Sequence, residues 1–185
     1  MTLVTFRHVR FDGRESEART WEVLRRGTAS AVLPYDPWTD QVVLVEQFRI
    51  AAVAAGFDGV MTEVPAGLMD EGETPEQTAV RELGEETHLV ADRLTPIGDI
   101  LLAAGCSDER IAIFAGRVHA PEAGADGVAG FGGLEGEGED LRIRVLPAED
   151  VIERAIAGQY ANSVTAISLL WLATRRETLR REWLA

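Results

Sequence analysis

The sequence predicts an α/β fold, in which a mixed β-sheet is covered by helices and preceded by an N-terminal β arm. Short apolar segments between residues 28 and 118 alternate or run together as strands do. A carboxylate-rich segment at 74–87 has the pattern of a single helix. Two further helical patterns follow residue 147, so strands and helices are mixed along the chain.

The first 27 residues are expected to form the β arm, apart from a main domain at 28–185. Two extended stretches with a period of two flank a turn at Asp12-Gly13. A pair of strands is marginally stable alone and must pack on something. Trp21 lies in the second stretch, where a cross-strand packing role is one interpretation.

Two strands are expected next, at 28–36 and 41–49, joined by the turn DPWTD. The second contains four consecutive apolar residues, Val42 to Val45, which is typical of a strand covered on both faces. Residues 50–60 are interpreted as a loop. Two more strands are expected at 92–102 and 110–118, and another at 141–146. The chain then closes with two helices, the first ending near Gly158.

The helix at 74–87 carries the most informative chemistry. Thr74 is a good N-cap, Pro75 suits the first helical position, and Gln77 completes a capping box. Three glutamates with i, i+3, i+4 spacing share one face of this helix: Glu82, Glu85 and Glu86. Three like charges repel, and Mg²⁺, which prefers oxygen ligands, would offset that cost. The alternative is a solvated face on which Arg81 pairs with Glu85.

The composition limits the function classes. A chain of 185 residues suffices for one well-buried domain. The net charge of −13 argues against nucleic-acid binding. With no apolar run long enough to span a bilayer and no signal peptide at Met1, we expect no membrane partner. The single cysteine, Cys106, cannot form an internal disulfide, which fits a reducing cytoplasm.

Residues 67–89 resemble the Nudix box, G-x5-E-x7-R-E-U-x-E-E-x-G-U, where U is aliphatic. The matching residues are Gly67, Glu73, Arg81, Glu82, Leu83, Glu85, Glu86 and Leu89. His88 stands where the family has a glycine at the helix end, so we expect local strain and an intact metal site. The resemblance implies a Nudix-type α/β/α sandwich with a mixed curved sheet and the box helix on one face.

The same resemblance implies a function and a metal site. It implies Mg²⁺-dependent hydrolysis of ADP-ribose, or a similar nucleoside diphosphate derivative, to AMP and ribose 5-phosphate, with Mn²⁺ as an alternative ion. The implied ligands are the Ala66 carbonyl, presented by a tight turn at Gly67, and three glutamates: Glu82, Glu86 and Glu139. The resemblance implies that Glu85 bridges metal ions or orients the reacting groups. It also implies that Arg81 and Glu73 stabilise the conformation of the box through contacts behind the metal ligands. A GDP-mannose or other nucleotide-sugar hydrolase is the nearer alternative, and a non-catalytic nucleotide sensor the more distant one.

Residues 121–139 are rich in glycine and show no regular pattern, as in a functional lid or a disordered loop. The ADP-ribose branch of the family takes its general base and a further metal ligand from this loop. Aligned on the strand that follows, Glu137 matches the base and Glu139 the ligand. Glu135 lies two residues earlier, and a slip of two residues would exchange the roles.

The resemblance also implies substrate contacts. Arg49 ends the string VEQFR, where the matching arginine of the ADP-ribose branch binds substrate; a solvated strand end is the alternative. Glu109 is a second candidate, with a pair to Arg110 as the alternative. Ala104 stands where that branch has a proline. This difference affects the assignment of the substrate and leaves the assignment as a hydrolase unchanged. In dimeric relatives the N-terminal segment reaches the partner subunit, so we expect a homodimer in which Trp21 lines the base pocket.

Overall fold

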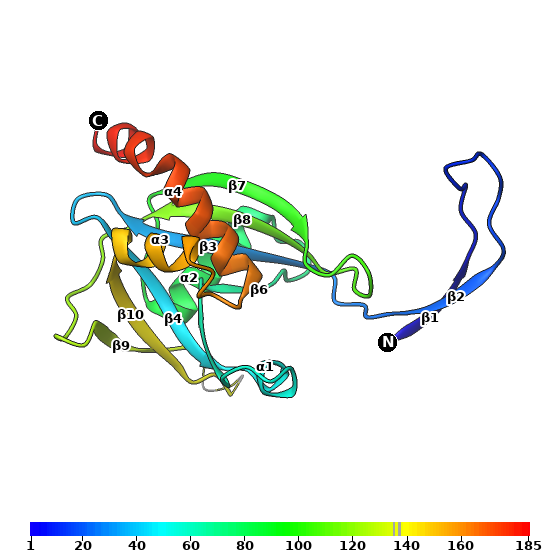
Figure 1. Cartoon of the computed structure of the whole chain (residues 1–185). Coiled ribbons are helices and arrows are strands. Elements are labelled where there is room, and N and C mark those ends of the chain that lie inside the picture. The colour runs from blue at the N-terminus through cyan, green and yellow to red at the C-terminus, as the bar shows by residue number, and fades with distance from the viewer. Residues whose placement is uncertain (135, 137) are drawn as a thin grey trace.

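The structure, a computed structural model, describes residues 1–134, 136 and 138–185. Within them an eight-stranded mixed sheet has the order β7-β8-β3-β4-β10-β9, with β5 added to β4 and β6 to β3 (Figure 1). The strands are β3 (Thr28–Asp36), β4 (Gln41–Phe48), β5 (Val60–Glu63), β6 (Ala66–Leu68), β7 (Arg93–Leu101), β8 (Arg110–Arg117), β9 (Val128–Gly132) and β10 (Leu141–Pro147). β3 pairs in parallel with β8 and antiparallel with β4 and β6.

Helices cover both faces of the sheet, and the side-chain alternation of β3 explains why. Leu33 and Tyr35 point into a cluster with α3 (Ala148–Ile156) and α4 (Ser163–Leu184), while Val32 points the other way, toward α2 (Pro75–Thr87). A strand buried on both faces needs helices on each side. The predicted α/β/α sandwich of the Nudix type is therefore confirmed. No helix in the described part of the chain is long and apolar enough to cross a membrane.

The start of α2 has the predicted cap. The Thr74 hydroxyl accepts from the Gln77 N–H at 3.3 Å, and the Gln77 side chain accepts from the Thr74 N–H at 2.8 Å. The helix ends at His88, which adopts φ 60° and ψ 16°, in the left-handed region. The histidine thus takes the backbone conformation for which the family uses glycine, at the strain that a side chain imposes there.

The N-terminal arm forms its own two-stranded antiparallel sheet of β1 (Thr2–Phe6) and β2 (Arg19–Val23). It extends away from the main body, as the blue hairpin of Figure 1 shows. Its base is tied to the loop between β7 and β8. Leu24 N–H donates to the Cys106 carbonyl at 2.8 Å, and Arg26 N–H donates to Asp108 at 2.8 Å.

Three local expectations were wrong. Residues 50–60 begin with a short helix, α1 (Ile50–Ala54), in an alanine-rich stretch of good helix formers. Residues 121–139 contain the strand β9, which no periodicity reveals because its place is set by pairing with β10. Gly67 lies in β6 opposite Ser30 rather than in a tight turn.

Candidate active site

A cavity of about 540 Å³ lies over the carboxylate face of α2. Charged and polar side chains dominate its lining: Arg26, Arg49, Glu63, Asp70, Arg81, Glu82, Glu85, Glu109, Glu139 and Asn162. Ala66 and Gly67 of β6 contribute backbone to the same wall. Sheet pairing positions that wall, because Ala66 lies opposite Ala31 of the central strand β3. Tertiary structure thus gathers into one pocket residues that lie more than a hundred positions apart.

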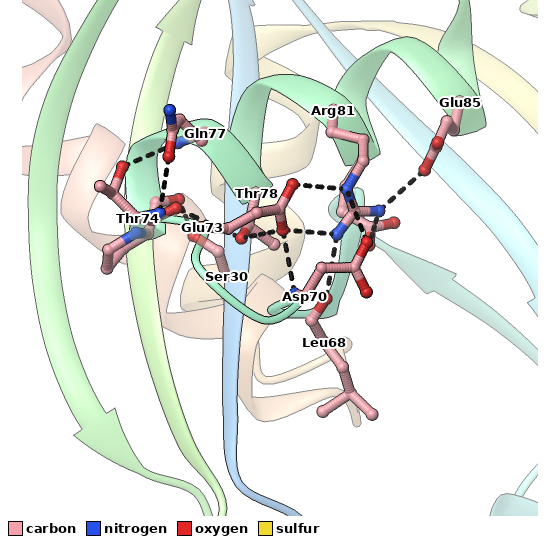
Figure 2. A network of polar contacts seen from close by, with 11 residues as sticks. Ser30, Leu68, Asp70, Glu73, Thr74, Gln77, Thr78, Arg81 and Glu85 are labelled. Carbon is pink, nitrogen blue, oxygen red and sulfur yellow. Dashed lines mark hydrogen bonds and ion pairs between the residues drawn. The ribbon is translucent and has the colours of Figure 1, made fainter.

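Arg81 is the hub of the polar network beside this cavity (Figure 2). Its Nε and Nη2 donate to the two oxygens of Glu73 at 2.9 and 3.0 Å, and Nη2 also donates to the Leu68 carbonyl at 3.0 Å. Its Nη1 donates to Glu82 at 2.7 Å and to Glu85 at 2.9 Å. One guanidinium therefore joins the loop before α2 to two glutamates of the helix face, and it fixes their orientation.

Burial and mutual repulsion make the carboxylates of α2 unusual acids. Glu82 and Glu86 are buried. Burial, together with the charges of Glu82 and Glu139, raises the pKa of Glu86 to about 8. Burial also raises the pKa of Glu82, although Arg81 opposes it. Glu139 contributes to both shifts, so its charge lies close enough to α2 to act with the other two glutamates.

The donor set fits a hard divalent cation. Glu86 Oε2 is buried without a hydrogen-bond partner among the described residues, and the two neighbouring carboxylates raise the cost of its charge. A cation with oxygen ligands would satisfy that atom and offset the repulsion. As the described side chains stand, no three His, Cys, Asp or Glu residues form a group placed to hold an ion.

Close backbone contact brings the glycine-rich loop onto α2. A Cβ built on Gly132 would lie 1.9 Å from the Glu86 carbonyl oxygen, so only glycine fits at that position. The next residue, Gly133, donates its N–H to the Glu85 carbonyl at 3.1 Å. Glu139 follows at the pocket, where its Oε2 accepts from the Leu134 N–H at 3.0 Å. The predicted juxtaposition of this loop with the helix is thus present.

Arg49 lies at the pocket with a defined partner. Its Nε and Nη2 donate to one oxygen of Glu63, at 3.0 and 2.7 Å. The other oxygen of Glu63 accepts from the Asn162 amide at 2.9 Å. Glu63 is only 6% exposed, so it is a buried link between Arg49 and α4.

Glu109 also lies at the pocket, but its partner is not the neighbouring arginine. Its Oε1 is 3.6 Å from Nε of Arg26, whereas Arg110 pairs with Asp99. Trp21 does not line the pocket of its own chain. It packs edge-on against Phe6, with ring centroids 5.1 Å apart, in the cross-strand role given as its alternative. Glu135 and Glu137 lie outside the described residues.

Sequence reasoning did not identify Arg26 or Asn162 as pocket residues. Arg26 belongs to the base of the arm, and Asn162 signals only the cap of a helix. Neither sits in a motif, so no spacing could have placed it. The only local signal was polarity at the ends of elements, which is common on any protein surface.

Comparison with known proteins identifies a family and several relatives. The NUDIX domain family model matches residues 24–164. An ADP-ribose pyrophosphatase of Escherichia coli strain K12 is 37% identical over 99% of this chain and 85% of its own length. One from Haemophilus influenzae is 35% identical over 97% of this chain and 82% of its own length. A GDP-mannose pyrophosphatase of Salmonella typhimurium is 32% identical over 83% of this chain and 77% of its own length.

This chain belongs to the Nudix family. The resemblance seen in residues 67–89 is therefore confirmed.

Proposed function

We propose that this chain is a Nudix pyrophosphohydrolase that hydrolyses the diphosphate of ADP-ribose to AMP and ribose 5-phosphate. One observation carries the proposal. The pocket combines carboxylates on α2 with the guanidinium of Arg49. The chain matches ADP-ribose pyrophosphatases over nearly its whole length. Carboxylates suit the cation that an anionic diphosphate needs, and a guanidinium suits phosphate oxygens directly.

Four groups would hold the cation: the carboxylates of Glu82, Glu86 and Glu139 and the carbonyl of Ala66. When bound, Mg²⁺, or Mn²⁺ in its place, supplies positive charge to the diphosphate and lowers the pKa of water. Glu82 lines the pocket with its orientation held by Arg81 at 2.7 Å, so this ligand is pre-oriented. The buried, unpartnered oxygen of Glu86 supports its assignment as a ligand.

Side chains of the protein bind the substrate and transfer the proton. Arg49 donates to phosphate oxygens, and Glu109 binds a polar group of the substrate. Glu137 accepts a proton from the attacking water as the O–P bond forms, while the bridging P–O bond breaks and its electrons stay with the leaving phosphate. Glu85, held by Arg81 at 2.9 Å, orients the attack.

We propose a homodimer assembled through the arm, residues 1–27, with residues 28–185 as the hydrolase domain. Leu3, Val9, Phe11 and Trp21 of the arm are exposed in the single chain, and an isolated hairpin is marginally stable. The arm carries six arginines and four acidic residues, whereas the whole chain has a net charge of −13. A basic, apolar arm suits the acidic body of a second copy, where Trp21 would line the base pocket. The cytoplasm is the compartment we propose.

A substrate panel tests the function. ADP-ribose, GDP-mannose, NADH and diadenosine polyphosphates would be compared in Mg²⁺, with products identified by chromatography. We expect the highest kcat/KM for ADP-ribose, with AMP released. A higher kcat/KM for GDP-mannose would favour the second candidate, which the Salmonella relative supports. No turnover of any substrate, with nucleotide still bound, would favour a sensor.

A further inference from the structure

We infer that Asn162 is a positioning residue for substrate binding, which acts through Glu63 to hold the Arg49 guanidinium in one orientation toward the pocket. The inference rests on the proposed function in one respect, since it takes Arg49 as the residue that meets the substrate's phosphate. Neither Asn162 nor Glu63 is itself offered as a contact with the reacting atoms.

The geometry of Glu63 carries the first step. One oxygen, Oε2, accepts from Arg49 Nε and Nη2 at 3.0 and 2.7 Å, and the other, Oε1, accepts from Asn162 Nδ2 at 2.9 Å. The carboxylate is 6% exposed and is held from both ends. Its plane cannot rotate without breaking one of these contacts. Asn162 therefore sets the direction in which Glu63 presents its other oxygen to Arg49.

The consequence for Arg49 follows from the shape of a guanidinium. The Nε edge of the planar fork is occupied by Glu63, which leaves the other N–H groups available, Nη1 among them. In the described part of the chain, Nη1 has no hydrogen-bond partner. The side chain of Arg49 is 45% exposed and lines the cavity. A fork fixed along one edge presents the opposite edge to an incoming phosphate at little further entropic cost.

The position of Asn162 is fixed by α4. Its Oδ1 caps the helix by accepting from the Thr165 N–H at 3.0 Å, and this bond determines that Nδ2 faces Glu63. The Thr165 hydroxyl in turn accepts from the Val64 N–H at 3.0 Å, next to Glu63 in sequence. Large side chains of α4, including Leu169, Leu172 and Trp183, are buried in the core. The donor to Glu63 thus stands on a rigid element.

Asn162 has two roles, cap and donor, and two substitutions separate them. Asn162→Ser keeps a good N-cap acceptor but removes the donor to Glu63. Asn162→Asp keeps the cap and the shape, but places a carboxylate against Glu63. We expect both variants to fold with a lowered unfolding midpoint, because Asn162→Ser leaves a buried oxygen of Glu63 without a donor and Asn162→Asp places two carboxylates against each other. We expect KM for ADP-ribose to rise about tenfold in Asn162→Ser and further in Asn162→Asp, with kcat changed less than twofold. Ser163→Ala, in the same turn and outside this chain of bonds, is the control.

A double variant tests the hydrogen bond itself. In Asn162→Asp combined with Glu63→Gln, the amide and the carboxylate exchange places. The glutamine introduced at 63 can donate to the new carboxylate and still accept from Arg49. We expect this pair to reverse most of the increase in KM that Asn162→Asp causes. A purely structural cap would give no such recovery.

A readout without substrate separates this inference from the proposed function. Solvent exchange of the Arg49 Nε–H can be followed by NMR, with the signal assigned from Arg49→Lys. We expect slow exchange in the wild type and at least tenfold faster exchange in Asn162→Ser. Inactivity toward ADP-ribose with this acceleration present would defeat the proposed function and leave the positioning role standing. Wild-type exchange and wild-type KM in Asn162→Ser would overturn the inference.

Discussion

Glu82 occupies the space that a side chain at Gly67 would need. A Cβ built on Gly67 would lie 2.0 Å from Glu82 Oε1 and 2.2 Å from its Cδ. Gly67 is therefore required because the buried carboxylate presses against its backbone. Gly67, the first residue of the box, and Glu82 on its helix thus meet at the wall of the pocket.

This contact predicts the effect of Gly67→Ala. The added methyl group must displace Glu82, and a shift of about 1 Å at a reacting centre costs about 10²-fold in rate. We expect kcat to fall by at least that factor in a protein that still folds, measured by ADP-ribose turnover and circular dichroism. Gly98→Ala is the control, since nothing lies within 4 Å of the added atom. Equal rates in both variants would show that the position of Glu82 does not matter for turnover.

Glu86→Gln tests the metal site. The substitution keeps the shape of a buried side chain but removes its charge, so the cation loses a ligand while the packing is retained. We expect turnover to be abolished with an unchanged circular dichroism spectrum. Glu76→Gln, on the exposed first turn of the same helix, should retain wild-type rates. A near-normal rate for Glu86→Gln in saturating Mg²⁺ would mean that this helix face holds no catalytic cation.

The glutamates of the glycine-rich loop are separated by their response to metal. A lost base lowers the rate by about 10²–10⁴-fold, and added Mg²⁺ cannot restore it. We expect that behaviour for Glu137→Gln. A lost ligand weakens metal binding, so Glu139→Gln should recover as Mg²⁺ is raised, and Glu135→Gln should be mild. Steady-state rates across a Mg²⁺ titration make the distinction. If all three variants kept wild-type kcat and KM, the base would lie elsewhere, with Glu85 the next candidate.

Acid stability should depend on Glu73. Hydrogen bonds from Arg81, the Asp70 backbone and Thr78 lower the pKa of Glu73 from 4.5 to about 2. A lowered folded-state pKa stabilises the fold above the unfolded value, and that stability is lost as the pH falls through 4.5 toward 2. The gap in urea-unfolding free energy between wild type and Glu73→Gln should therefore be largest at neutral pH and vanish near pH 2. Glu71→Gln, an exposed neighbour, should show no such pH-dependent gap.

Removal of residues 1–23 tests the arm. The cut retains Leu24, whose N–H and carbonyl bond to the loop at Cys106 and Asp108, so the base of the arm stays in place. We expect a monomer by sedimentation velocity, with sharply reduced kcat/KM. Trp21→Ala is the matched point variant. This variant should remain a dimer, because the strands of the arm still pair. Its KM should rise, because the base of the substrate loses the indole on which it would stack. A full-length chain that is monomeric and fully active would contradict the dimer.

Local sequence determined the box helix. The cap at Thr74, the carboxylate face and the end at His88 all depend on residues within one or two turns, whose spacing is fixed by helix geometry. The strands β3, β4, β7 and β8 followed from the same short-range periodicity, whereas the short strands β5 and β6 did not. β9 escaped detection because a glycine-rich strand has no periodic pattern and exists only through its pairing with β10.

The pocket depended on contacts that span the chain. The chain of bonds from Asn162 through Glu63 to Arg49 joins residues up to 113 positions apart, and Arg26 faces Glu109 from the base of the arm. Such pairs arise from the stacking of a sheet between helices, and no local spacing encodes them. The raised pKa of Glu86 belongs to the same class, since it comes from the packing that surrounds the carboxyl and the sequence shows only an acid on a helix.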